Sequence, residues 1–283
     1  MSPLNPGNDL FEHDAPSSIR VGIGGWTYAP WRNNFYPPKL VQRRELEYAS
    51  RVLTSVEING TYYGAQKPAT YAKWSAETPE GFVFSLKAPR YTTDRRTLAD
   101  AGKTIEDFID GGLAELGDRL GPILWQFPTY KSFEADDFAG FLDLLPRELN
   151  GYRLRHVLEV RHVSFMTDAY FALARRHRLP SAFTDSSTYP SFADLTGDFV
   201  YARLMRSESA IASGYRPEAL DAWARRAQLW SAGSEPDDLP RVQAVSATAA
   251  KTKKSRDVYI YFISSAKERN PAAAMLLAQK LNT

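Results

Sequence analysis

Charged side chains recur at the same phase of successive apolar segments that have β-strand character. Glu57 lies in TSVEINGTYY and Lys87 lies in FVFSLKAPR. A charge inside an apolar strand is costly unless it is paired or faces a wet cavity, so these residues predict one polar site near the ends of neighbouring strands. The full set comprises Glu57, Lys87, Glu159, Arg161, Asp185 and Arg203.

The chemistry open to this set is anion binding with proton transfer. Arg161 and Arg203 carry planar guanidinium groups, which suit a two-pronged grip on a carboxylate or a phosphate. Glu57 or Glu159 would act as the general acid or base. Lys87 would add a point charge, or would act as a base if its neighbours depress its pKa.

Strand alternation places the charges on one face of the predicted sheet. In SVEING, Glu57 and Asn59 share one face and Val56 lies on the other, since successive side chains of a strand point in opposite directions. Gln126 of ILWQFP and Asp185 of SAFTDS can join the same inner set. We expect the apolar faces to pack under helices and the polar faces to point toward a barrel axis.

Two other interpretations of the charges stay open. The three acids and three bases could form a neutral ion-pair network that fills the barrel without binding any substrate. Lys87 could instead form a Schiff base, because its place near a strand end is one that barrel enzymes use for reactive groups.

Ligands for a divalent metal are also present in the sequence. Glu57, Glu159, Asp185 and His162 are suitable oxygen and nitrogen donors. The positive charges of Lys87, Arg161 and Arg203 would repel a bound metal ion. In addition, His162 lies on the opposite strand phase from Glu159. We therefore predict no cofactor, with a divalent metal as the minor alternative, and keep His162 among the substrate-binding residues.

Aromatic residues follow the first two predicted strands. Trp26, Tyr28 and Trp31 lie in GGWTYAPW, and Tyr62 and Tyr63 lie in GTYYG. They could form a stacking wall for a sugar or a nucleobase. The alternative is that they pack as loops over the mouth of the barrel.

Composition limits the class of protein. The chain has 283 residues, and a single α/β barrel typically needs about 250. The net charge of +2 gives no strong electrostatic case for a nucleic-acid partner. The absence of cysteine excludes disulfides and thiolate metal sites. No secretory signal or long apolar run is present, so we expect a cytoplasmic protein with no membrane partner.

Strand and helix patterns alternate along the chain, which favours a parallel sheet with right-handed crossovers. We predict an α/β fold, a single-domain (β/α)8 TIM-type barrel with a short or missing helix between strands six and seven. GIGGW lacks the glycine spacing of a dinucleotide-binding turn, which disfavours an open doubly wound sheet. The predicted strands are 19–23, 55–60, 82–89, 121–128, 156–162, 181–186, 198–205 and 258–264. The predicted helices are 40–53, 68–77, 104–119, 134–145, 167–178, 217–231 and 271–281.

Two segments fall outside this alternation. Residues 1–18 are polar and contain proline, and we predict a flexible tail before a barrel over 19–283. Residues 232–257 have no clear period and end in a basic cluster, which predicts a long irregular insertion. It would be either a solvated linker or a mobile basic arm over a ligand.

Several sequence blocks, in the same order, resemble the YecE-like family (domain of unknown function 72). They include GIGGWTYAPWRNNFYP, VEINGTYYG, WSAETPEGFVFSLKAPR, LGPILWQFP, EVRHVSF and FVYARLM followed by GYRPEALDAWA. The resemblance runs from about residue 20 to residue 230 and resumes at VYIYFISSAKERNPAAAMLLA. It implies a (β/α)8-type barrel, but no reaction, because the family's biochemical function is not established.

The chain departs from the usual family pattern at four places. Met205 and Arg206 stand where the family usually has His-Gly, and 264–265 is Ser-Ser where it usually has Asn-Asn. Asp94 replaces a usual histidine, and Phe165 a usual tryptophan. These departures indicate a divergent member with altered or lost chemistry.

Three classes of function fit the sequence. The first is a hydrolase, lyase or isomerase that acts on a polar, anionic small molecule such as a sugar phosphate. The second is a nucleic-acid-binding or nucleic-acid-processing barrel, in which aromatic loops stack bases and the basic run at 251–256 contacts phosphates. The third is a non-catalytic ligand-binding domain.

Overall fold

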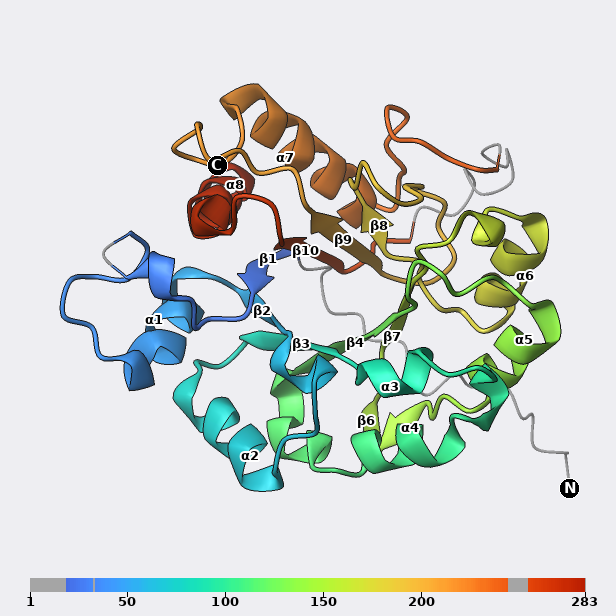
Figure 1. Cartoon of the computed structure of the whole chain (residues 1–283). Helices are drawn as coiled ribbons and strands as arrows, with labels where there is room; N and C mark the ends of the chain where they lie inside the picture. Colours follow the sequence, from blue (N-terminus) through green and yellow to red (C-terminus); the bar gives the residue numbers. More distant parts are fainter. Residues whose placement is uncertain (1–18, 33, 244–253, 283) are drawn as a thin grey trace, which may run out of the picture.

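The computed structural model describes residues 19–32, 34–243 and 254–282, and its centre is a ring of parallel strands surrounded by helices (Figure 1). Eight strands form one sheet. They are β1 (Ile19–Gly24), β2 (Ser55–Ile58), β3 (Val83–Lys87), β4 (Leu120–Gln126), β7 (His156–Glu159), β8 (Phe183–Thr184), β9 (Val200–Leu204) and β10 (Val258–Phe262).

The sheet closes on itself. Every pairing between neighbouring strands is parallel, and β1 pairs with both β2 and β10. A parallel bridge between Leu158 and Ser181 joins the two ends of the strand order, β7 and the segment before β8. Residues 185–199, between β8 and β9, contain no helix. The predicted (β/α)8 barrel, with a helix missing between its sixth and seventh strands, is therefore confirmed.

Helices follow the other strands and cover the outside of the ring (Figure 1). Two of them begin with a proline, α2 at Pro68 and α7 at Pro217, as the sequence predicts, because proline suits the first helical turn. The helices are α1 (Glu45–Val52), α2 (Pro68–Glu77), α3 (Arg90–Thr93), α4 (Gly102–Ile109), α5 (Ala135–Asp143), α6 (Asp168–Arg176), α7 (Pro217–Ser231) and α8 (Asn270–Leu281).

The predicted helix over 104–119 is broken in the structure. α4 ends at Ile109, and a 3₁₀ segment, η5 (Leu113–Arg119), follows it. Gly112 has a φ of 119°, which ends the regular helix at a backbone angle that glycine tolerates best. A short antiparallel hairpin, β5 (Glu148–Leu149) with β6 (Tyr152–Arg153), was also not predicted.

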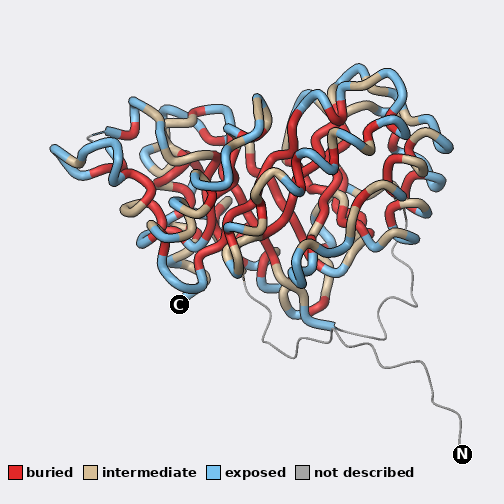
Figure 2. Tube along the Cα trace, turned by 90° about the horizontal axis from the view of Figure 1, so that it is seen from below, coloured by how far each residue is buried: buried red, intermediate tan, exposed pale blue. Residues whose placement is uncertain are grey.

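The barrel has two apolar layers, and strand alternation sorts them. Val56, Phe84 and Leu158 belong to the large cluster between the strands and the helices, whereas Leu124 and Val157 belong to a smaller cluster that we assign to the barrel interior. Figure 2 shows the buried strands in the centre of the molecule and exposed backbone on the outer surface. The predicted assignment of apolar faces to the helix side agrees with this packing.

Gly22 on β1 makes room for the aromatic filling of the barrel. A Cβ at this position would lie 2.1 Å from the carbonyl oxygen of Ser55 and 3.1 Å from the ring of Tyr261. The Tyr261 hydroxyl in turn lies 2.6 Å from the Ser55 hydroxyl. A side chain at position 22 would therefore displace either strand β2 or the tyrosine beneath the charged site.

The two segments outside the alternation are only partly described. Residues 232–243 and 254–257 contain neither helix nor strand, whereas the predicted tail at 1–18 and residues 244–253 lie outside the described residues. Arg256, from the basic run, donates hydrogen bonds to the carbonyls of Ser231 and Ser234. Over the described ranges, no helix is long and apolar enough to cross a membrane.

Candidate functional site

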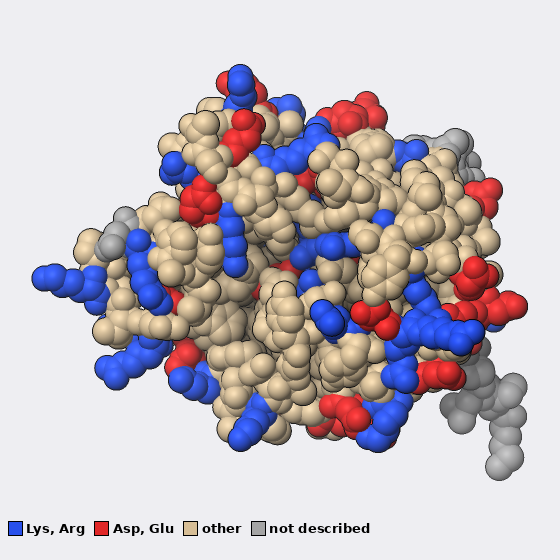
Figure 3. Space-filling view, in the orientation of Figure 1, with Lys and Arg blue, Asp and Glu red and all other residues tan. Residues whose placement is uncertain are grey.

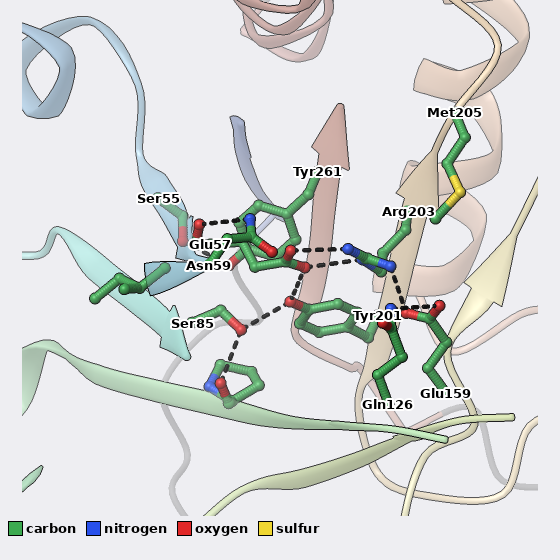
Figure 4. Close-up of polar contacts among 12 residues, drawn as sticks. Ser55, Glu57, Asn59, Ser85, Gln126, Glu159, Tyr201, Arg203, Met205 and Tyr261 are labelled. Atoms are coloured by element: carbon green, nitrogen blue, oxygen red, sulfur yellow. Dashed lines mark hydrogen bonds and ion pairs between the residues drawn. The ribbon is translucent and has the colours of Figure 1, made fainter. Parts of the chain in front are cut away.

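Arg203 is the centre of a charged cluster at the carboxyl ends of the strands. Its side chain, from β9, is 2% exposed and points across the barrel toward two carboxylates (Figure 4). Its Nε and Nη2 donate to the two carboxylate oxygens of Glu57, each at 3.0 Å. Its Nη1 donates to Oε2 of Glu159 at 2.5 Å. One guanidinium therefore links β2 and β7 through the barrel interior.

A layer of hydroxyl groups supports the cluster from below. Tyr201, two residues before Arg203 on the same strand face, donates to Oε2 of Glu57 at 2.7 Å. Its hydroxyl also lies 2.8 Å from that of Ser85 (Figure 4). Burial, reinforced by the charge of Glu57, raises the pKa of Tyr201 well above its ordinary value, so this phenol stays a hydrogen-bond donor.

Glu159 is held as a carboxylate by three donors. Arg161 donates through Nε at 2.6 Å and Gln126 through Nε2 at 2.9 Å, both to Oε1. Burial alone would raise the pKa of Glu159, but the charges of Arg203, Arg161 and Lys87 outweigh it and lower the pKa to about 2. Glu159 therefore carries no proton to donate at neutral pH.

Lys87 is the cation of this site without a carboxylate partner. Its side chain, at the end of β3, is 8% exposed, and its ammonium lies 3.6 Å from the centre of the Tyr62 ring. Among the described residues, neither an ion pair nor a hydrogen bond engages its Nζ. Burial lowers the pKa of Lys87 to about 8; Arg203 and Arg161 add to the decrease, and Glu159 and Glu57 oppose it.

The charges of the cluster do not balance. Both oxygens of Glu57 and both oxygens of Glu159 accept hydrogen bonds from protein donors. Two carboxylates thus face three cations, the third of which is Lys87. In Figure 3, basic side chains surround a hollow near the centre of this face of the barrel. The arrangement suits an anion that would supply the missing negative charge.

Asp185 lies beside this cluster without joining it. Its carboxylate accepts a hydrogen bond from the backbone nitrogen of Met205 at 2.5 Å. Burial raises the pKa of Asp185 to about 6, against the effect of that hydrogen bond and of Arg206. Met205 is the first residue after β9, so this hydrogen bond holds the turn that follows the strand. Asp185 takes no part in the ion pairs of Arg203 with Glu57 and Glu159.

Two other predicted polar residues, Asn59 and His162, form hydrogen bonds with backbone groups near them. Asn59 follows β2, and its amide nitrogen lies 3.4 Å from the backbone oxygen of Glu57, as Figure 4 shows. His162 caps the 3₁₀ helix η6 (Val163–Phe165), where its Nδ1 accepts from the backbone nitrogen of Ser164. Among the described residues, no group of three or more His, Asp or Glu side chains is arranged to hold a metal ion.

The predicted aromatic wall is divided between packing and surface. Trp26 packs edge-on against Trp74 with 5.0 Å between ring centres, on the helix side of the barrel. Tyr28 lies under the ammonium of Lys267 at 4.5 Å. Tyr63 is 78% exposed. These three residues do not line the charged cluster together.

Two tyrosines contact the cations of the site, and one of them, Tyr189, is absent from the predicted aromatic wall. Tyr62, in the 3₁₀ helix η3 (Gly60–Tyr62), belongs to the predicted wall and lies under Lys87. Tyr189 covers the guanidinium of Arg161 at 4.4 Å and donates to the sulfur of Met205 at 2.8 Å. Tyr62 was detectable from its place directly after β2, but Tyr189 lies in an irregular segment that carries no periodic signal.

Ser264 and Ser265 have a backbone feature that bears on the departures from the family pattern. Their φ angles are 61° and 50°, in the left-handed region that asparagine adopts more readily than serine. The usual Asn-Asn pair therefore suits the turn itself. Ser265 still donates to the carbonyl of Ser207 at 2.8 Å.

Two hollows lie away from the charged mouth. One, of about 370 Å³, is at the opposite end of the barrel, where Arg155 pairs with Asp257 at 2.5 Å. The other, of about 910 Å³, lies beside α6 and includes the Arg241–Glu235 ion pair. The lining of the second hollow contains as many acidic as basic side chains, whereas that of the first contains more basic side chains (Arg147, Arg153, Arg155, Arg178 and Lys254) than acidic ones (Glu148 and Asp198).

Comparison with known proteins agrees with this architecture. The family model "Protein of unknown function DUF72" matches residues 20–283. A curated relative, "UPF0759 protein YunF" of Bacillus subtilis (strain 168), is 27% identical over 126 residues, which are 43% of this chain and 44% of that protein. The match thus spans less than half of the relative's length.

Solved structures of the same family have the same fold. The DUF72 family protein TM1631 of Thermotoga maritima MSB8 has a TM-score of 0.69 at 19% identity, covering 94% of this chain and 99% of its own. The DUF72 family protein EF0366 of Enterococcus faecalis V583 has a TM-score of 0.67 at 14% identity, covering 94% and 96%. The match of the family model over nearly the whole chain shows that the protein belongs to the DUF72 family.

Proposed function

We propose that the protein is an enzyme that binds a small carboxylate or phosphate compound at the mouth of the barrel and acts on it by proton transfer. The observation that carries this proposal is the unpaired ammonium of Lys87 beside two saturated carboxylates. A buried cation without a counter-ion is costly, and an anionic ligand would remove that cost.

Arg161 offers a second contact to the same ligand. Its Nε and Nη2 reach Glu159, while its Nη1 has no hydrogen-bond partner among the described residues. Its side chain is 20% exposed, compared with 2% for Arg203. All three nitrogens of the Arg203 guanidinium thus donate to carboxylates, whereas Arg161 and Lys87 supply the donors that an anion can reach.

Within the charged cluster, which Asp185 does not join, Lys87 is also the group best suited to transfer a proton. A general acid or base works best when its pKa lies near the operating pH. The pKa of Lys87 is about 8, whereas that of Glu159 is about 2. We therefore assign proton transfer to Lys87, and to Glu57 and Glu159 the task of holding the arginines in place.

Anion binding can be measured directly. We expect inorganic phosphate or lactate to bind the protein in calorimetric titration at low ionic strength, and Lys87→Met to weaken binding at least about tenfold, or about 1.4 kcal/mol. Lys267→Met is the matched control, because Lys267 also lies over an aromatic ring but has no arginine or carboxylate among the causes of its pKa shift. Equal affinities for the protein and for Lys87→Met would contradict the proposal.

The same titration separates the other two classes of function. Binding of single-stranded DNA or RNA that weakens steeply with salt, in place of small-anion binding, would favour the nucleic-acid alternative. Tight binding of a small anion without conversion of any tested compound would favour a ligand-binding domain.

A further inference from the structure

We propose that Lys87 is a nucleophile that forms an imine with a small carbonyl compound bearing a carboxylate or a phosphate. This inference rests on the proposed anion site and adds to it the chemical class of the substrate. In this proposal, Lys87 forms a covalent bond with the substrate as well as attracting its negative charge.

The surroundings of Lys87 differ from those of the ion-paired lysines. Lys73, Lys103 and Lys280 form ion pairs with a glutamate or aspartate. Lys87 and Lys267 have an aromatic face under the ammonium instead, and of these two only Lys87 also has arginines and carboxylates among the causes of its pKa shift. An aromatic ring leaves the amine lone pair free once the proton is lost, whereas a carboxylate contact would hold the proton on the nitrogen.

The neighbouring cations favour the same step. Burial disfavours the charged form of Lys87 most strongly, and Arg203 and Arg161 add to this effect, against the opposite effect of Glu159 and Glu57. With a pKa of about 8, far more of Lys87 is a neutral amine near neutral pH than the roughly 0.1% of an ordinary lysine. A nucleophilic lysine activated by burial and by nearby cationic groups is an established route to imine formation.

The position of the amine also fits the substrate class. Lys87 ends β3, and the free Nη1 of Arg161 follows β7, so an anionic group held by Arg161 would place an adjacent carbonyl inside the same mouth. In the reaction, the neutral amine of Lys87 bonds to the carbonyl carbon, and the carbonyl oxygen leaves as water with one proton from the amine and one proton from the solvent, equal to the one that the ammonium released beforehand. The product is a protonated imine, and no oxidant or reductant is consumed.

Borohydride trapping tests this step. The protein is incubated with pyruvate or with dihydroxyacetone phosphate, reduced with sodium cyanoborohydride, digested, and mapped by mass spectrometry. We expect the reduced adduct at Lys87 to exceed that at Lys267 at least about tenfold, because the site holds the carbonyl near one amine. Lactate and glycerol 3-phosphate, which carry the same anions without the carbonyl, should suppress labelling of Lys87 and leave that of Lys267 unchanged.

Two variants and one parallel measurement separate the outcomes. Lys87→Arg keeps the charge but has no primary amine, so its specific adduct should be lost; Arg161→Met should reduce labelling of an intact Lys87. Thermal melting with lactate and with pyruvate reports anion binding independently. If both anions raise the melting temperature while Lys87 is labelled no more than Lys267, the imine is wrong and the anion site stands. If neither anion changes melting and Lys87 is not labelled, both proposals are wrong.

Discussion

Arg203→Leu is expected to cost about 3–5 kcal/mol of the free energy of unfolding, which is the usual effect of removing one partner of a buried ion pair. Arg203 supplies three hydrogen bonds to Glu57 and Glu159, both fully buried. Without it, the carboxylate of Glu57 keeps only the phenol of Tyr201. Urea unfolding at pH 7 measures the change, and the melting temperature should fall by roughly 10 °C.

Two further variants test whether the stability lost in Arg203→Leu comes from the carboxylates that are left without their partner. Arg161→Leu removes a partly exposed guanidinium from Glu159 and should cost about 1 kcal/mol or less. The double variant Glu57→Leu/Arg203→Leu removes both charges of the bidentate pair and should recover part of the stability lost in Arg203→Leu. If Arg203→Leu and Arg161→Leu were equally stable, the central place of Arg203 would be refuted.

Gly22→Ala is expected to destabilise the barrel by more than about 3 kcal/mol, at the upper end of the cost of overpacking. Its new methyl group would lie 2.1 Å from the carbonyl oxygen of Ser55, an atom of the neighbouring strand that cannot rotate away. Relief requires β1 and β2 to separate, which would also move Glu57 away from Arg203. Circular dichroism during urea unfolding measures the stability.

Gly24→Ala on the same strand is the matched control. A Cβ there would lie 3.0 Å from the amide nitrogen of Asn59, a side-chain group that can shift. We expect it to cost less than about 1 kcal/mol. A protein with Gly22→Ala that is as stable as one with Gly24→Ala would show that the close approach at Gly22 has been misjudged.

Strand alternation made most of the fold and part of the site predictable. Glu57, Lys87 and Arg203 each interrupt an apolar segment at the inward phase, and a period of two residues places such charges on one face. Their position at the carboxyl ends of parallel strands then brings them together. The sequence could not show which acid each base would pair with, because pairing depends on strand register and on the reach of each side chain.

Residues outside the strands were the ones that sequence reasoning misplaced. Tyr189 reaches Arg161 from an irregular segment, and nothing in its neighbours predicts that contact. The sequence predicts Trp26 at the mouth, but it packs on the helix side, because the turn after β1 directs its ring toward Trp74. Loop side chains have no periodic signal, so their direction follows from tertiary packing alone.

The roles of the acids also needed the structure. Both Glu57 and Glu159 were candidates for proton transfer, and a sequence gives no information about which carboxylates are saturated by arginines. Once the hydrogen bonds are known, Glu159 has a pKa of about 2, and Lys87, with a pKa of about 8, is the group within the cluster that can exchange a proton; Asp185, with a pKa of about 6, lies beside the cluster. The ion-pair network and the reactive group are thus parts of one cluster.

The pKa of Lys87, measured by NMR with and without a bound anion, tests the central claim most directly. The lysine side-chain signals are titrated between pH 6 and pH 11, and Lys87→Arg assigns the resonance. We predict a pKa of about 8 without an anion and an increase of about one unit with saturating lactate, because a bound anion favours the charged amine. An ordinary lysine pKa that lactate leaves unchanged would contradict the account. The groups whose charges or rings face this amine are Glu57, Tyr62, Glu159, Arg161 and Arg203.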